Sequence, residues 1–194
     1  TLRERLAQDT AVRGVLTGLD LRLVYEPGTE PVVLATLIGS RAARSELLLL
    51  ARWLGTRARV RGVALRVQAE PAIQLLEGEL EIVAGSAEAR DCLRPGGPYH
   101  YATFGSFVQA HRGQAAAMAA AIQRALALRL GTLRGQRVLE LFAGSGALGL
   151  ELCQAGAQVT LVERYAPALE HAVRAQREQE LPALRTLAGD AEQV

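Results

Sequence analysis

The stretch "RVLELFAGSGALGLEL", residues 137–152, decides the fold. It begins with strand-forming residues, passes through a glycine-rich turn and continues as an apolar helical pattern. Two further strands and another helix follow in the same alternation. We expect strands at 137–142, 158–163 and 184–188, and helices at 146–155 and 166–179. Strands that alternate with helices predict a parallel sheet with right-handed connections.

The ends of these three strands carry glycine and acidic residues. Gly144 and Gly146 follow the first strand, Glu163 ends the second, and Asp190 follows the third. Ligands of such sheets bind at the carboxyl ends of the strands, and glycine lets them approach the backbone closely. A carboxylate at Glu163 can accept both hydroxyls of a ribose, and one at Asp190 can accept a hydrogen bond from an adenine amino group. The pattern predicts an adenosine-containing cofactor.

Two cofactors compete for this turn. Its glycines complete the dinucleotide pattern G-x-G-x-x-G with Gly144, Gly146 and Gly149. With Glu163 at the acidic spacing, they leave an NAD-dependent oxidoreductase as an alternative. Glu140, however, lies inside the first strand, like the acidic residue of the methyltransferase signature E/D-x-x-x-G-x-G, and a helix expected at 112–130 precedes that strand. Both features favour S-adenosylmethionine.

Residues 1–105 show a different pattern. "LDLRLVY" and "PVVLATLIG" flank the turn "EPGTEP" and predict a hairpin. "SRAARSELLLLARWLG" predicts a helix with Ser40 as N-cap and Gly55 as its stop. "RVRGVALRVQ" and "LEGELEIVAG" predict further strands. The breaker cluster "RPGGPYHY", residues 94–101, predicts a hinge, so we expect one subdomain at 1–105 and another at 106–194.

Composition bounds the class of protein. A hydrophobic content of 49% predicts a folded core, and neither a signal peptide nor a membrane span is present in the pattern. Cys92 and Cys153 match no disulfide or metal-site spacing, which favours a reducing cytoplasm. The net charge is only +2, and all 22 basic residues are arginines. A cluster of five could meet phosphates, although a solvated face is the commoner reading: Arg52, Arg57, Arg59, Arg61 and Arg66.

The segment "FGSFVQAH" (104–111), the long helix and "GQRVLELFAGSGALGLEL" together resemble the RNA uracil-5-methyltransferases. That family carries a Phe-x-Gln-x-Asn segment ahead of the same helix, then a similar glycine turn. Phe107 and Gln109 match the segment, and His111 replaces its Asn. Matches at the turn and the next strand ends are Phe142, Gly144, Gly146, Glu163 and Asp190. Departures are Ala143, Ala147, Gln176 and Gln179, the last two where asparagines are usual.

The resemblance implies an α/β fold: a mixed α/β subdomain, then the first half of a Rossmann-like S-adenosylmethionine-dependent methyltransferase domain. The residues expected at the cofactor are Gln109, Glu140, Phe142, Gly144, Gly146, Glu163 and Asp190. The resemblance further implies methyl transfer to uracil C5 of rRNA or tRNA in the cytoplasm. The family's nucleophilic cysteine follows the third strand by a long interval, so we expect this chain to be a fragment without catalytic residues of its own.

Several alternatives stay open. They are an amino-group methyltransferase acting on RNA or DNA, the oxidoreductase, and an RNA-binding module without chemistry. Unpaired sheet edges predict a homo-oligomer. We expect Cys153 to be a buried apolar residue, Cys92 a loop thiol and His111 a surface residue at a helix start. Four aromatic residues are assigned equally to base stacking and to packing: Tyr99, Tyr101, Phe104 and Phe107.

Overall fold

The computed structural model describes residues 2–8, 14–68, 78–109, 111–182 and 184–193. The chain forms two compact units, each with its own core. The first comprises Thr1–Val24, Thr29–Ala89 and Thr103–Gly105, and the second Tyr25–Gly28, Arg90–Ala102 and Ser106–Val194. A division into domains at residues 105 and 106 stays a prediction. No described helix is long and apolar enough to cross a membrane.

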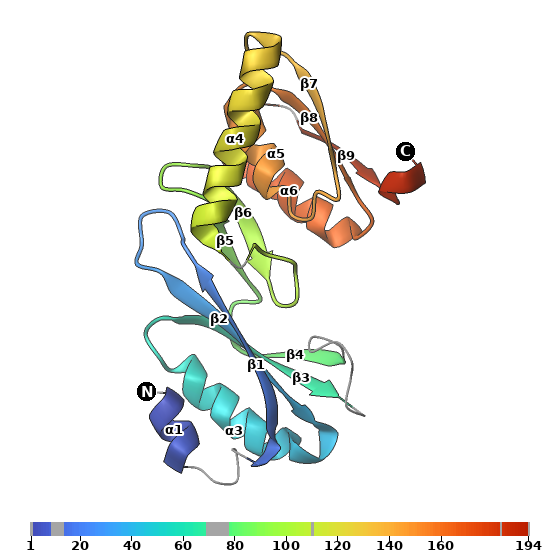
Figure 1. The fold of residues 1–194 in the computed structure, drawn as a ribbon. Coiled ribbons are helices and arrows are strands. Elements are labelled where there is room, and N and C mark those ends of the chain that lie inside the picture. The colour runs from blue at the N-terminus through green and yellow to red at the C-terminus, as the bar shows by residue number, and fades with distance from the viewer. Residues whose placement is uncertain (1, 9–13, 69–77, 110, 183, 194) are drawn as a thin grey trace. The chain divides into compact units, whose positions relative to one another are not determined.

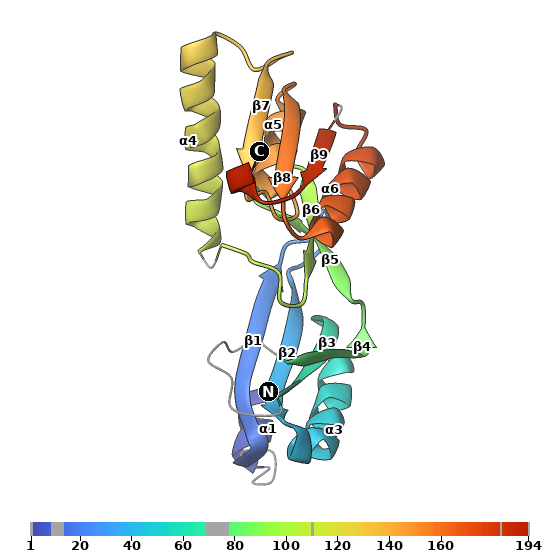
Figure 2. The same ribbon diagram turned by 90° about the vertical axis from the view of Figure 1, so that its right-hand side faces the viewer.

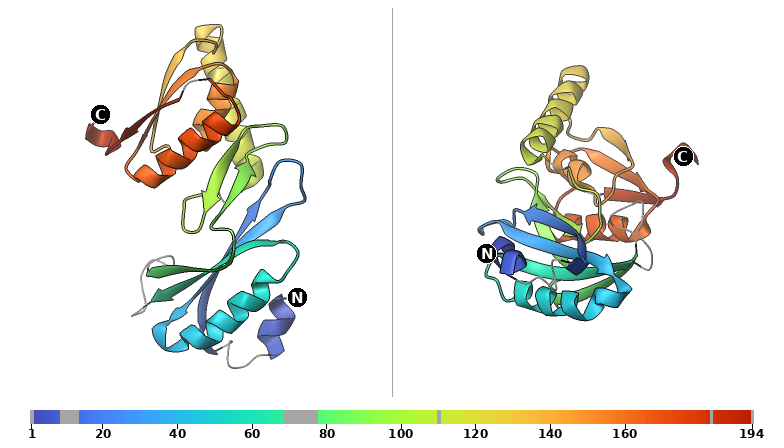
Figure 3. Two further views of the ribbon diagram at one scale, coloured as in Figure 1. Left: turned by 180° about the vertical axis from the view of Figure 1, so that it is seen from behind. Right: turned by 60° about the horizontal axis from the view of Figure 1, so that its bottom comes forward.

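The first unit is built on a four-stranded sheet covered by a helix (Figures 1 and 3). Its strands, in spatial order, are β1 (Leu16–Val24), β2 (Val32–Ser40), β3 (Val60–Gln68) and β4 (Glu79–Gly85). β1 and β2 form the predicted antiparallel hairpin, β3 joins parallel to β2, and β4 is antiparallel to β3. β4 corresponds to the strand predicted at 76–85, of which residues 76 and 77 lie outside the described residues. A short helix, α1 (Leu2–Gln8), also belongs to this unit.

Helix α3 (Arg44–Gly55) buries Leu47, Leu50 and Leu54 against the sheet. Its predicted start is wrong in detail. Ser40 makes no side-chain cap, because the 3₁₀ turn η1 (Arg41–Ala43) intervenes before the helix. The helix ends at Gly55, as predicted.

A two-stranded sheet pairs β5 (Glu88–Cys92) with β6 (Tyr99–Thr103). Only part of the predicted hinge is irregular, because Tyr99–Tyr101 form strand and are buried. Their aromatic and histidine side chains alternate with the strand period, and this outweighs the preceding prolines and glycines. β5 was not predicted, since "EARDC" is too polar to read as a strand.

Helix α4 (Arg112–Leu130) has the predicted bounds. Met118 and Leu130 are 45% and 40% exposed, whereas Ala115 and Ala119 are buried. The buried side of this helix thus combines small alanines with Leu126, which packs against the core of the second unit.

The predicted parallel sheet is present in the second unit (Figure 2). Its elements in chain order are β7 (Arg137–Leu141), α5 (Ala147–Gln154), β8 (Gln158–Glu163), α6 (Ala166–Glu178), β9 (Leu184–Ala188) and the 3₁₀ turn η2 (Ala191–Gln193). The strands run in the order β7-β8-β9, both pairs parallel. α5 and α6 cover one face, where Val159 and Leu161 are buried. On the other face Leu139 and Leu187 are 55% and 46% exposed.

Candidate functional site

The carboxyl ends of β7, β8 and β9 meet around Glu163. The Gly144 N–H donates to Glu163 Oε2 at 3.0 Å. The Tyr165 N–H donates to Glu163 Oε1 at 2.9 Å, and the Gly189 N–H donates to the Glu163 carbonyl at 3.1 Å. The structure therefore brings the glycine turn, the acidic strand end and the start of the Asp190 loop to one edge of the sheet. The Asp190 side chain is exposed there.

The glycine turn needs its glycines for two different reasons. Gly144 has φ 55°, and a Cβ at this position would meet nothing within 4 Å, so the space beside it is open. Gly146 has φ 76°, and a Cβ there would lie 2.8 Å from Leu161 Cδ1. Only glycine fits that contact, because α5 begins at the next residue and packs directly on β8. Gly144 leaves room for a ligand, and Gly146 allows α5 to pack closely on β8.

Glu140 is held beneath the turn. Its carboxyl accepts the Gly149 backbone N–H, and burial raises its pKa to about 7. A Cβ on Gly149 would lie 2.6 Å from Glu140 Oε2, so the third glycine of the motif makes room for this carboxyl. Oε2 is shielded from solvent and has no hydrogen-bond partner among the described residues. A buried acceptor of this kind beside an open turn suits a ligand that brings a donor.

Two other predicted residues are exposed. Phe142, with φ 57°, is 73% exposed directly before the turn. Gln109 is exposed in the segment ahead of α4, where Phe107 is 84% exposed. Within the described parts of the chain, no hydrogen bond joins Gln109 to the strand ends.

The segment that carries Gln109 is anchored at its far end. His111 caps α4, because its Nδ1 accepts the Gln114 N–H at 3.2 Å, which confirms the predicted surface position. Arg112 pairs with the buried Asp91, NH2 to Oδ2 at 2.8 Å. Its guanidinium also lies 4.5 Å from the ring centre of Tyr25. The capping histidine thus has a structural role at the position where the family carries asparagine.

Tyr165 belongs to this edge and was missed by the sequence analysis. Its side chain is 65% exposed, and its N–H orients the Glu163 carboxylate. An aromatic residue two positions after an acidic strand end was the available signal. Such a ring is suited to stacking against a planar base.

Neither cysteine is a candidate nucleophile. Cys153 is fully buried as predicted, and burial raises its pKa to about 11. Cys92 is the buried last residue of β5 rather than a loop thiol, and burial raises its pKa as well. No group of three or more His, Cys, Asp or Glu side chains in the described chain could hold a metal ion.

The other aromatic residues are divided between core and surface. Tyr99, Tyr101 and Phe104 are buried. The hydroxyls of Tyr99 and Tyr101 both donate to Glu178 Oε2 at 2.6 Å. Packing thus accounts for these three, and Phe107 alone of the four keeps an accessible ring.

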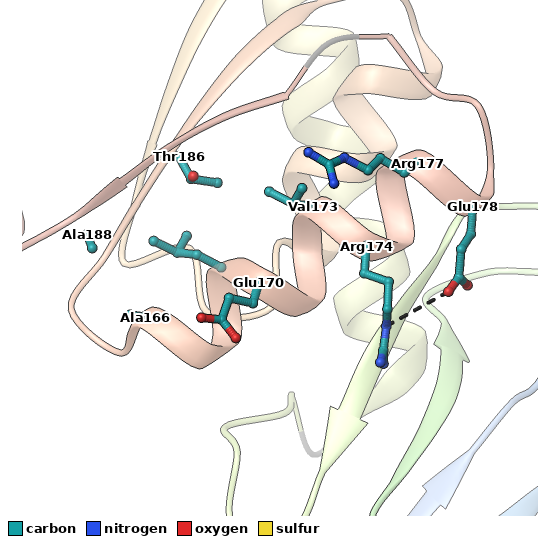
Figure 4. A pocket seen from close by; sticks show the side chains of 9 residues that line it. Ala166, Glu170, Val173, Arg174, Arg177, Glu178, Thr186 and Ala188 are labelled. Carbon is teal, nitrogen blue, oxygen red and sulfur yellow. Dashed lines mark ion pairs between the residues drawn. The ribbon is translucent and has the colours of Figure 1, made fainter.

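A hollow of about 520 Å³ lies between α6 and β9 (Figure 4). It begins at Ala166 and Ala188, which adjoin the Glu163 end of the sheet, and runs along α6 to Glu178. Arg174 and Glu178 approach each other on its wall, Nε to Oε1 at 3.9 Å. The hollow therefore adjoins the candidate site without including its glycines.

No protein-family model matches the sequence, and no curated protein matches it. Solved structures do match. The Pyrococcus abyssi tRNA (uracil-54, C5)-methyltransferase in complex with S-adenosyl-L-homocysteine aligns with TM-score 0.66 and 15% identity, over 98% of this chain and 46% of its own. The M. jannaschii tRNA m1G37 methyltransferase aligns with TM-score 0.58 and 14% identity, over 94% and 51%. P. horikoshii TYW2 in complex with MeSAdo aligns with TM-score 0.52 and 15% identity, over 100% and 64%.

The chain spans about half the length of the first two structures. At this identity the similarity concerns the fold. The chain has the Rossmann-like α/β fold of these methyltransferases, with a mixed α/β unit ahead of the sheet that carries the glycine turn.

Proposed function

We propose that this chain binds S-adenosylmethionine and is part of an enzyme that methylates RNA. The observation that carries the proposal is the Glu163 carboxylate, held by the Gly144 N–H beside an open glycine turn. The matched structures support it, since one is a complex with S-adenosyl-L-homocysteine and another with MeSAdo. The donor would supply an electrophilic methyl group on a sulfonium.

The residues at this edge suit that ligand. Glu163 keeps lone pairs beyond the two bonds to Gly144 and Tyr165, so it can accept ribose hydroxyls. Asp190 can accept a hydrogen bond from the adenine amino group. The unpartnered Oε2 of Glu140 can accept from a donor group that enters beside the turn. Phe142 and Gln109 are assigned to the cofactor by the family resemblance.

For the acceptor we propose uracil C5 in tRNA or rRNA, on the strength of "FGSFVQAH". In that chemistry a thiolate adds to C6, and the resulting enolate takes the methyl at C5, which leaves the donor as S-adenosylhomocysteine. A base then removes the C5 proton, and the C6–S bond breaks to restore the ring double bond and release the thiolate. Cys92 and Cys153 are buried. Neither is therefore proposed as the source of this thiolate.

Guanine N1 is the second candidate acceptor. The tRNA m1G37 methyltransferase matches 94% of the chain with TM-score 0.58, and methylation of a ring nitrogen requires no thiolate. Mass-spectrometric mapping of RNA treated with the full-length protein would decide. We expect 5-methyluridine, and 1-methylguanosine in its place would transfer the assignment to the second candidate.

The cofactor proposal is tested by calorimetric titration of this chain with S-adenosylhomocysteine. We expect saturable binding, and a loss of at least about tenfold in affinity for Glu163→Ala, because hydrogen bonds to a charged acceptor contribute roughly 1.5–3 kcal/mol each. Glu30→Ala, a change at an exposed position in the first unit, is the control. Circular dichroism would show that both variants are folded. Binding of NADH without binding of S-adenosylhomocysteine would replace the proposal with the oxidoreductase.

A further inference from the structure

The turn between α3 and β3 is strongly and one-sidedly basic. Between Leu47 and Gln68 the sequence has five arginines and no acidic residue. Residues 56–59 are all exposed, as are Arg52 before them and Arg61 after them. The positive charge therefore lies on the surface of the first unit rather than in its core.

The two ends of α3 treat their arginines differently. At its beginning, Arg41 and Arg44 pair with two glutamates of β4, at 3.4 and 2.7 Å. At its end, Arg52 and Arg57 form no ion pair with any described carboxylate. Arg59 approaches Glu30 at 3.4 Å, but both side chains are more than 70% exposed. Such an exposed pair contributes little free energy in water, so Arg59 can exchange Glu30 for a phosphate at small cost.

Arg57 is also held in a defined orientation. Its guanidinium lies 4.7 Å from the ring centre of Trp53. Its Nε and NH2 donate to Thr56 Oγ1 at 3.2 and 2.6 Å. A planar cation stacked on an indole and exposed on its outer side offers a platform for a nucleobase, and its N–H groups can reach a phosphate.

We infer that this surface, formed by Arg52, Trp53, Arg57, Arg59 and Arg61, binds RNA. Arg52, Arg57 and Arg59 would contact phosphates, and the outer face of Arg57 would stack on a base. The inference rests on the proposed RNA substrate and assigns its docking to the first unit. The glutamate-paired arginines at the other end of α3 serve as an internal comparison, because their removal changes the net charge equally.

The test is fluorescence anisotropy with a fluorescein-labelled, unmodified tRNA transcript at several salt concentrations. Arg52→Gln/Arg57→Gln is compared with Arg41→Gln/Arg44→Gln. The association constant falls as salt rises, and loss of two phosphate contacts should make the negative slope of log K against log salt shallower by roughly 1.4 to 1.8. Affinity at ~0.1 M salt should fall by at least about tenfold. The control pair should stay within about twofold. Arg57→Lys should keep the salt slope and weaken binding, since the charge stays but the planar stack is lost.

An equal loss in both double variants, or no loss in either, would overturn the inference. So would binding to phosphatidylserine vesicles without binding to tRNA. The same variants titrated with S-adenosylhomocysteine keep the two proposals apart. If cofactor binding fails while tRNA binding depends on Arg52 and Arg57, the surface stands and the methyltransferase proposal falls. If the cofactor binds and tRNA binding does not depend on Arg52 and Arg57, the methyltransferase proposal stands and the inference about this surface falls.

Discussion

A single carboxyl, Glu140, combines a motif position with an unusual environment. Its place inside β7, four residues before Gly144, is visible in the sequence. Its burial under α5 is not, because that depends on how closely Gly149 lets the helix approach. Desolvation raises the pKa of Glu140 from 4.5 to about 7. Between about pH 4.5 and 7, the Glu140 carboxyl therefore keeps its proton in the folded protein, whereas the same group in the unfolded chain has released it.

This proton predicts a pH dependence of stability. Because the folded state binds more protons between pH 4.5 and 7, the free energy of unfolding falls as pH rises across that window. A shift of this size is worth up to about 3 kcal/mol. Glu140→Gln removes the titration. Urea denaturation of both proteins from pH 4.5 to 7.5 should show wild type losing stability relative to the variant, and parallel curves would refute the prediction.

Glu163 shows how far residue-level reasoning reaches. That it would meet Gly144 follows from parallel strands ending at one edge, and the structure confirms the meeting. The two backbone N–H donors that orient its carboxylate depend on turn geometry, which the residue types do not specify. Tyr165 was not predicted for the same reason. Its contact with Glu163 is made by its backbone N–H, which is independent of its residue type, while its ring is exposed.

Among the elements, those with a clear hydrophobic period were predicted to within a few residues. β7, β8 and β9 agree closely, because strand and helix periods differ and a glycine turn separates them, and α4 agrees in its bounds. β5 was not predicted, because its stability comes from contacts with residues distant in the sequence. Asp91, its second-last residue, is buried with its carboxylate paired to Arg112 at the start of α4 and accepting the Tyr25 N–H.

That dependence makes the Arg112–Asp91 pair a test of how α4 is fixed. Arg112→Ala leaves the Asp91 carboxylate buried without its cation, because His100, 3.8 Å away, has its pKa lowered by burial and does not replace the charge. Breaking a buried pair from one side costs roughly 3–5 kcal/mol. Arg41→Ala, which breaks the exposed pair with Glu79, should cost less than about 1 kcal/mol.

Chemical denaturation of the two variants would measure this difference. Similar losses would mean that Asp91 gains little from Arg112. We also expect Arg112→Ala to weaken binding of S-adenosylhomocysteine, because the segment carrying Gln109 leads directly into this anchor. Unchanged affinity for S-adenosylhomocysteine would contradict the proposed contact between Gln109 and the cofactor.

At the scale of the molecule, the class of fold could be predicted from the sequence. Which arginines are exposed and which are paired or buried could not. Alternating strands and helices specify a parallel sheet, and the glycine turn marks the edge at which Gly144 meets Glu163. Whether an arginine is paired depends on what the fold brings opposite it. The five arginines from Arg52 to Arg66 look alike in sequence, yet Arg66 is partly buried and donates to the Gly78 carbonyl, while Arg52 is exposed.

The placement of the rarest residues gives each unit a spectroscopic reporter of its own. The single tryptophan, Trp53, belongs to the first unit, and the two cysteines belong to the second, where both thiols are buried. Indole fluorescence therefore follows the unfolding of one unit, while reaction with a thiol reagent follows the opening of the other. Coincident transitions along a denaturant series would show that the units unfold as one cooperative body, and separate transitions would give each its own stability without any engineered label.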